Sequence, residues 1–321
     1  MLICVLLMLR KKNINFFIIC LITFNFCCKK DPFVNECIEY KNVITTDPEK
    51  RSNKVLIVGI DGVRSDVISY ENSPFLHSFL NSSNSYSNLN HKTEKDTYSG
   101  PNWTSILTGV HYEKHNVLDN SFENNQLELY PNFFNYLESS MENHESYSLT
   151  NWVPLNQNVL KNDVDYANLE YYSDSLVFEF SKHIISEINT EHPSSIFIQF
   201  DELDGAGHKF GFSKDVDEYT QTLKQIDLYL NELYSLVEQR RSNGENWLVI
   251  FVSDHGGDGY SHADQNNPNI NQTMLIIDHP YIYFNNEYLS KMPDIVPTIF
   301  NFMGITNSYF NCYSDGESII L

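Results

Sequence analysis

Cysteine is scarce in this sequence once its first 30 residues are set aside. Four of the six cysteines lie in that segment, and only Cys37 and Cys312 follow it. Neither belongs to a Cys-x-x-Cys pair, which disfavours a cysteine-ligated zinc site. In an oxidising compartment the two could pair and join the ends of the chain, and the alternative is two unpaired thiols.

Basic residues are also few. The chain has 21 Lys and Arg against 42 Asp and Glu, and five of the basic residues lie in the first 30 positions, where there is no acid. The remainder therefore carries 16 basic against 42 acidic side chains. Such an excess of negative charge repels polyanions, so we expect no binding to a nucleic-acid duplex.

A bilayer-spanning segment is not expected near the N-terminus. The apolar stretch Phe16 to Phe26 is short for a transmembrane helix, and it follows the basic cluster Arg10 to Lys12, as in a targeting signal. Cys27-Cys28 ends the stretch, which resembles a bacterial lipoprotein signal in which a cysteine is lipidated. The alternatives are an ordinary secretory signal or a cytoplasmic chain with a misplaced start.

We therefore expect a signal segment over residues 1–28, a polar connection over 29–53 and a single catalytic domain over 54–321. The expected location is the cell envelope, meaning the periplasm or the outer membrane of a Gram-negative-type bacterium. Any contact with the membrane would then be made through the N-terminal lipid. Internal repeats and long Pro-, Gly- or Ser-rich linkers are absent from the sequence.

Apolar residues are plentiful enough for a packed core, at 41% hydrophobic and 14% aromatic. Three continuous apolar runs, 54–60, 195–200 and 247–252, predict strands that are buried on both faces of a parallel sheet. Amphipathic spacing predicts helices over 74–80, 131–142, 174–188 and 217–240. The expected fold is an α/β three-layer sandwich, with a mostly parallel central sheet and helices on both faces. The Asn- and Ser-rich segment 81–90 is expected to be a loop.

Acidic residues and histidines follow the predicted strands. Asp61 comes directly after the first strand, and carboxylates at the carboxyl ends of parallel strands can converge on one edge of a sheet. Asp204 and His208 follow the second strand. The glycines between them argue against a regular helix, so we expect a tight loop from which both side chains reach one cation.

Asp254 and His255 follow the third strand. Adjacent residues that leave a strand point in opposite directions, so this pair is expected to serve two positions or to bridge two cations. His262 lies seven residues beyond His255, after glycines that allow the chain to turn back. Taken singly, each of these residues is more often a turn or surface residue than a ligand.

Ser99 precedes a segment with helical character that Gly109 could close. Pro101 in the first turn would place Ser99 just ahead of free backbone N–H groups, where a phosphate oxyanion is stabilised and a serine alkoxide could attack. The competing interpretation is that Ser99 caps the helix.

Together these motifs resemble the alkaline phosphatase superfamily, most closely its type I phosphodiesterase/nucleotide pyrophosphatase family. The similarity runs from about Lys54 to Gly304. The resemblance implies an alkaline phosphatase-like fold and a hydrolase of small phosphate esters that has two divalent metal ions, usually zinc. It also implies a phosphoseryl intermediate on Ser99 and a phosphate-binding amide at Asn120. One implied metal site is formed by Asp204, His208 and His262, and the other by Asp61, Asp254, His255 and the Ser99 oxygen.

Some residues depart from the family pattern. Nucleotide-cleaving members usually have a threonine nucleophile followed by an aromatic residue, whereas Ser99 is followed by Gly100. The family's last histidine ligand often lies much further along the chain, which leaves His279 as a second candidate beside His262. Thr97 is the second candidate nucleophile.

The sequence leaves other functions open. A sulfatase would have arginine where Trp103 stands in Ser-Gly-Pro-Asn-Trp. Phosphomonoesterases and phosphonate hydrolases also stay open, because they use the same metals with different pocket walls. A lipid-anchored binding protein that has lost turnover should lack a ligand or the nucleophile, and this sequence has all six ligands and Ser99.

Overall fold

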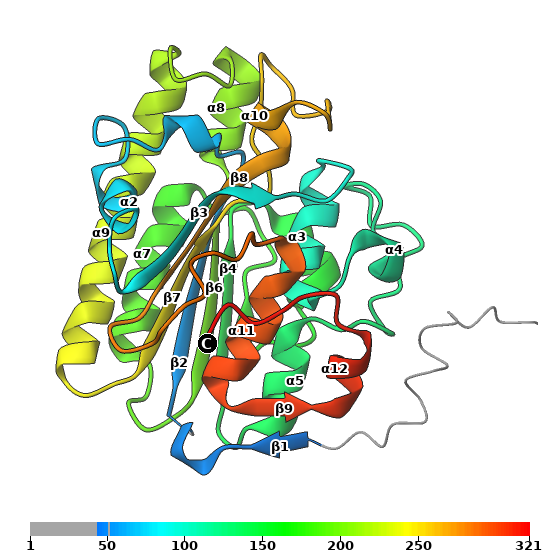
Figure 1. The fold of residues 1–321 in the computed structure, drawn as a ribbon, viewed down its shortest axis with the longest axis vertical. Coiled ribbons are helices and arrows are strands. Elements are labelled where there is room, and N and C mark those ends of the chain that lie inside the picture. The colour runs from blue at the N-terminus through cyan, green and yellow to red at the C-terminus, as the bar shows by residue number, and fades with distance from the viewer. Residues whose placement is uncertain (1–43, 51) are drawn as a thin grey trace, which may run out of the picture.

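A seven-stranded sheet forms the centre of the protein in the computed structural model, which describes residues 44–50 and 52–321 (Figure 1). The expected signal segment and Cys37 lie outside these residues. The strands of this sheet are β2 (Lys54–Ile60), β3 (Ser85–Lys92), β4 (Glu145–Thr150), β5 (Tyr166–Ala167), β6 (Ser194–Phe200), β7 (Trp247–Val252) and β8 (Gln272–Asp278). A separate pair is formed by β1 (Ile44–Thr46) and β9 (Ile305–Asn307).

Helices fill most of the connections between the strands. They are α2 (Pro74–Phe79), α3 (Ser99–Thr108), α4 (Tyr112–His115), α5 (Phe133–Ser140), α6 (Val153–Leu155), α7 (Asp174–Glu187), α8 (Glu202–Phe210), α9 (Asp217–Ser242), α10 (Pro268–Asn271), α11 (Ile295–Met303) and α12 (Ser308–Tyr313). Shorter helical turns lie at Pro48–Lys50, Ser65–Val67, Asn156–Leu160 and Met292–Asp294. No helix among the described residues is both long and apolar enough to cross a bilayer.

The sheet has the strand order β3-β8-β7-β2-β6-β4-β5. Strands β7, β2, β6, β4 and β5 are parallel, and β8 runs antiparallel to both of its neighbours. Lys54 at the start of β2 is in register with Ser194 of β6 and Trp247 of β7. These three central strands therefore end at the same edge of the sheet.

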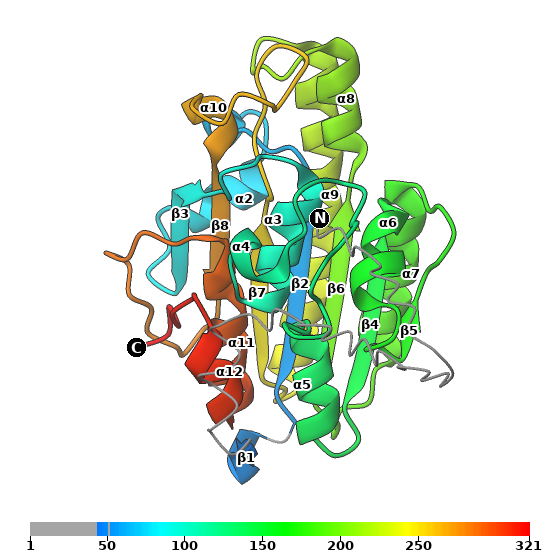
Figure 2. The same cartoon turned by 90° about the vertical axis from the view of Figure 1, so that its right-hand side faces the viewer.

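Both faces of the central strands are covered, as their continuous apolar sequences predict. Val55 and Ile57 of β2 pack into one core with residues of α3, α5 and α11, whereas Leu56 and Val58 pack into a second core with α2, α7 and α9. Figure 1 shows the two helical layers on opposite sides of the sheet, and in Figure 2 the layer that contains α3, α5 and α11 faces the viewer. The predicted three-layer α/β fold with a mostly parallel sheet is confirmed.

The expectation of a loop over 81–90 was wrong in part. Residues from Ser85 onward belong to the edge strand β3, because pairing with β8 satisfies the backbone and the buried polar side chains of Asn88 and His91 are hydrogen-bonded to Ser290. The expected connection over 29–53 contains β1, which pairs antiparallel with β9. Cys312 of α12 is disulfide-bonded.

Candidate functional site

The three central strands bring their polar residues to one edge of the sheet. Asp61 follows β2, and Asp254 and His255 follow β7, which is hydrogen-bonded to one side of β2. Asp204 lies in α8, which begins two residues after β6 on the other side of β2. This edge lies at the carboxyl ends of the parallel strands, where open α/β sheets bind their ligands.

Asp61, Asp254 and His255 form the first donor group. One possible ligand atom from each residue lies within 4.8 Å of the other two. Nε2 of His255 is 3.4 Å from Oδ1 of Asp61 and 3.3 Å from Oδ2 of Asp254. All three side chains are buried.

The two residues that follow β7 do not point apart, contrary to the prediction from strand geometry. Strand β7 ends at Val252, so Asp254 and His255 no longer have the alternating backbone on which that prediction depended. Both side chains turn toward Asp61 instead, which is the grouping that the family resemblance implies.

Asp204, His208 and His262 form the second donor group, again with ligand atoms within 4.8 Å of one another. Asp204 and His208 lie on a helix, so the predicted loop was wrong. Positions i and i+4 share one helix face, and Nε2 of His208 is 3.4 Å from Oδ2 of Asp204. The glycine at 207 has a packing role, because a Cβ atom there would lie 2.2 Å from the Phe212 ring.

The three histidines are oriented in the same way. In each, Nδ1 donates a hydrogen bond to a backbone carbonyl oxygen. The acceptor is Gly256 for His255 at 2.7 Å, Thr97 for His262 at 2.8 Å and Tyr260 for His208 at 3.0 Å. A carbonyl oxygen only accepts, so each Nδ1 carries the proton and each Nε2 lone pair is free to bind a cation. This arrangement is typical of metal-binding histidines.

The electrostatics of the two groups favour bound cations. Burial raises the pKa of Asp61, Asp204 and Asp254 well above the usual range for aspartate, and repulsion among these carboxylates raises each further. Burial lowers the pKa of His255 well below normal and that of His262 to about 4. The carboxylate atoms Asp61 Oδ1, Asp204 Oδ1 and Asp254 Oδ2 are buried without a hydrogen-bond partner. The donor set therefore fits divalent cations, which would stabilise ionised carboxylates and neutral imidazoles.

Ser99 lies beside the first group. It is the first residue of α3, and its Oγ is 3.3 Å from Nε2 of His255. The N-cap position is held by Tyr98, so Ser99 does not cap the helix. The hydroxyl of Thr97 donates to the carbonyl of His262, which makes Thr97 a support for that histidine.

Asn120 approaches Ser99 from a loop beyond α4. Its Oδ1 accepts a hydrogen bond of 2.8 Å from the backbone N–H of Gly100. A Cβ atom at position 100 would lie 2.7 Å from the carbonyl oxygen of Asp119, so a side chain there would displace this loop. The absence of an aromatic residue after Ser99 thus has a steric cause.

Sequence reasoning missed the buried groups that hold Asp61. Trp103 donates from Nε1 to Asp61 Oδ2 at 2.9 Å, and Gln199 donates from Nε2 to the same oxygen at 3.2 Å. Gln199 could have been noticed, since it is the one polar residue inside the apolar run 196–200.

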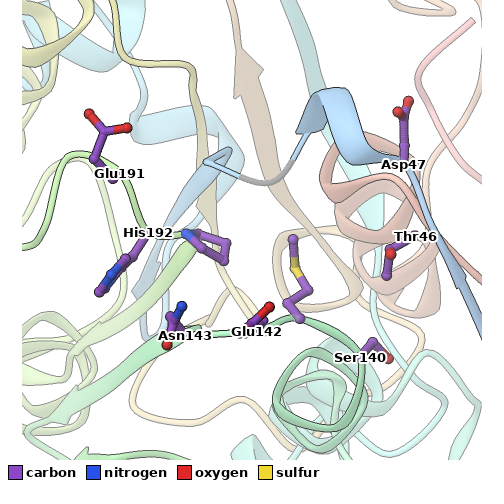
Figure 3. Close-up of a pocket in the computed structure, with 9 residues that line it drawn as sticks. Thr46, Asp47, Ser140, Glu142, Asn143, Glu191 and His192 are labelled. Carbon is purple, nitrogen blue, oxygen red and sulfur yellow. The ribbon is translucent and has the colours of Figure 1, made fainter.

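Two other features lie away from this edge. His279 follows β8, and its Nε2 is hydrogen-bonded to Oδ1 of Asn246 at 2.7 Å, so it joins neither donor group. A cavity of about 380 Å³ lies beside Pro193, which precedes β6 at the amino end of the strand (Figure 3). Its other lining residues include Asp47, Glu142 and His192, and none of the six donor residues reaches it.

Comparison with known proteins places these features in context. A sequence model of the type I phosphodiesterase / nucleotide pyrophosphatase family matches residues 55–170 and 149–289. The bis(5'-adenosyl)-triphosphatase ENPP4 of Pongo abelii is 26% identical over 280 residues, which cover 81% of this chain and 58% of ENPP4. The chain thus spans little more than half the length of that relative.

Solved structures share the fold. An inactive variant of murine ENPP5 in complex with AMP matches with a TM-score of 0.60 and 14% identity, covering 79% of this chain and 96% of ENPP5. A putative sulfatase from Bacteroides thetaiotaomicron matches with a TM-score of 0.66 and 14% identity, covering 84% of this chain and 74% of the sulfatase.

Proposed function

The chain belongs to the type I phosphodiesterase / nucleotide pyrophosphatase family, as its motifs predict, and we propose that it is a metal-dependent phosphodiesterase. One observation carries this proposal. Two groups of carboxylates and imidazoles lie at the same edge of the sheet, and a serine hydroxyl is 3.3 Å from the histidine of one group. This combination suits a phosphoryl transfer that begins at Ser99.

Each donor group would hold one divalent cation. A mixture of carboxylate and imidazole ligands suits zinc, and three protein ligands per cation leave a position open for other oxygens. A bound pair of cations supplies activation of a hydroxyl and stabilisation of the charge that develops on phosphate oxygens. Asp61, Asp254 and His255 would hold the cation nearest Ser99.

The reaction forms and breaks one bond in each of two steps. Ser99 Oγ attacks phosphorus, the ester oxygen departs with a proton, and a phosphoserine ester remains. Water then attacks the same phosphorus and restores the hydroxyl. Oδ1 of Asn120 is held by the Gly100 N–H, so its amide nitrogen is free to donate to a phosphate oxygen.

The charge of the site favours diesters over monoesters. Among the described residues, the hydrogen bonds and ion pairs of Ser99, Asn120 and the six donor residues involve no Lys or Arg side chain. A phosphate monoester is a dianion that proteins commonly bind with arginine, whereas a diester carries one negative charge. Phosphomonoesters are therefore the second candidate substrates.

Sulfate esters are the less favoured alternative. The fold is shared with a putative sulfatase, so the fold alone does not separate the two chemistries. Position 103 argues against sulfatase activity, because Trp103 occupies it and donates to Asp61. Nucleotides are candidate substrates because the chain is similar to the bis(5'-adenosyl)-triphosphatase ENPP4.

We also propose that the enzyme is located in the cell envelope and that a lipoprotein signal directs it there.

Assays of the purified protein test this function. Bis-p-nitrophenyl phosphate, diadenosine triphosphate, p-nitrophenyl phosphate and p-nitrocatechol sulfate would be compared with and without a chelator. We expect the diesters or the dinucleotide to be cleaved fastest, and activity to disappear on chelation and return with zinc. A faster sulfate ester, or hydrolysis that survives chelation, would overturn the proposal.

A further inference from the structure

The side chain of Gln199 connects two carboxylates at the candidate site. Gln199 lies in β6, directly opposite Gly59 of β2, and is fully buried. Its Nε2 donates to Asp61 Oδ2 at 3.2 Å and to Asp201 Oδ1 at 3.1 Å. One amide group therefore supplies both of its hydrogens to acids on neighbouring strand ends.

The orientation of this amide is fixed by the backbone. Oε1 of Gln199 accepts a hydrogen bond of 2.9 Å from the N–H of Trp152. If the amide were flipped, two N–H groups would face each other at Trp152, and an oxygen would face the carboxylates of Asp61 and Asp201. The nitrogen must therefore point toward the acids.

The two oxygens of Asp61 have different environments as a result. Oδ2 accepts hydrogen bonds from Gln199 and from Trp103, whereas Oδ1 is buried without a hydrogen-bond partner and lies 3.4 Å from Nε2 of His255. Two donors on one oxygen hold the carboxylate so that the other oxygen faces the remaining members of its group.

We propose that Gln199 is a positioning residue that holds the Asp61 carboxylate so that its Oδ1 is presented to a divalent cation. This inference rests on the proposed function, because it assigns a cation to the Asp61 group. Asp201 lies close enough to raise the pKa of Asp61, and it belongs to neither donor group. With the amide removed, Oδ2 of Asp61 loses one of its two donors, and the carboxylate can rotate away from its group.

Zinc affinity tests the proposal, measured by competition with a fluorescent chelator on the full-length chain. Gln199→Met keeps the size of the side chain and removes its donors, and Trp103→Phe removes the other donor while keeping an aromatic ring. We expect each variant to weaken one of the two zinc-binding steps by roughly 10- to 100-fold, as loss of a supporting hydrogen bond does at other metal sites. The second binding step should keep its affinity.

Asn156→Leu is the matched control. Asn156 is also a fully buried amide with several hydrogen bonds, and its partners Ser148 and Asn168 are not part of either donor group. This variant should lose stability without any change in zinc affinity. The increase in melting temperature on adding zinc gives a second readout, which should shrink only in the Gln199 and Trp103 variants.

The outcomes separate this inference from the proposed function. If the unaltered protein fails to bind two zinc ions, the proposed function and the inference both fall. If it binds two, and Gln199→Met and Trp103→Phe bind them equally well, only the positioning role is overturned. Equal weakening of both steps in Gln199→Met and Asn156→Leu would also overturn it, since that pattern reports general destabilisation.

Discussion

The imidazole rings of His255 and His262 stack on each other, with 3.9 Å between their centroids and 19° between their planes. The two histidines belong to different donor groups, so the groups contact each other through these stacked rings. Two protonated rings would repel each other at this distance, and burial lowers the pKa of both. Burial, with the repulsion of His262 added at His255, therefore favours the neutral form of both residues, which is the form that binds metals.

Replacing Ser99 tests the nucleophile. Ser99→Ala should lower turnover of bis-p-nitrophenyl phosphate by on the order of 10³-fold or more, because no other hydroxyl among the described residues is hydrogen-bonded to Nε2 of His255. The zinc content, measured by mass spectrometry, should stay at two per chain. Thr97→Ser is the control, since it keeps the hydroxyl that supports His262, and it should retain activity.

Replacing a histidine tests the division into two groups. His262→Ala should lose one equivalent of bound zinc, because it removes one of the three donors of the Asp204 group. His279→Ala should keep both equivalents, since the partner of His279 is Asn246. Full zinc occupancy in His262→Ala would exclude this residue as a ligand.

Asn120→Ala tests the phosphate-binding amide. The loss of one donor to a developing charge lowers kcat by roughly 10²- to 10³-fold in comparable sites. We expect a loss of this size with unchanged zinc content, measured by steady-state kinetics on the diester. A KM increase with unchanged kcat would instead assign Asn120 to ground-state binding.

Gly100→Ala tests the contact between α3 and the Asn120 loop. The added Cβ would lie 2.7 Å from the Asp119 carbonyl oxygen, so we expect the unfolding free energy to fall by about 1–3 kcal/mol. Activity should fall with it as Asn120 is displaced. Gly205→Ala, where the Cβ meets nothing within 4 Å in a helix, should leave both activity and folding intact.

Acid should destabilise the fold through two histidines outside the donor groups. Burial lowers the pKa of His91 and of His115 to about 3, whereas an unfolded chain protonates histidine near 6.5. Below pH 6.5 the unfolded state thus binds more protons, and stability present above that pH is lost as pH falls toward 3. Each histidine should contribute about 1–2 kcal/mol of loss between pH 7 and 5.

Urea unfolding in the presence of EDTA measures this effect without interference from metal binding. The unfolding free energy of His115→Asn should depend less steeply on pH than that of the unaltered protein. Between pH 7 and 5 its loss of stability should be smaller by about the 1–2 kcal/mol that one histidine contributes. The same slope in both proteins would contradict the assigned pKa.

The central strands and the residues at their ends could be predicted because each signal is local. A continuous apolar run such as 247–252 indicates a strand, and a carboxylate after it falls at the carboxyl edge of the sheet. Helix α8 could not be predicted in this way, since the packing of Gly207 against Phe212 outweighs the poor helix propensity of glycine.

Long-range pairing accounts for the other errors. Strand β3 has a polar sequence and becomes a strand only because β8 lies beside it. The amide of Gln199 acquires its partners from Asp61 on another strand and from Trp152 after β4, contacts that no spacing in the sequence reveals. The directions of Asp254 and His255 depend on where β7 stops, which is equally invisible in the sequence.

The short strand β1 lies at the end of the sheet opposite the candidate site. Thr46 and Asp47, at the end of β1, line the same cavity as Pro193, at the amino end of β6. Asp61 lies at the far end of β2, about 23 Å further along a strand of this length. A fusion partner joined directly to Ile44 would therefore be attached at the opposite end of the sheet from the two donor groups and would leave that edge accessible.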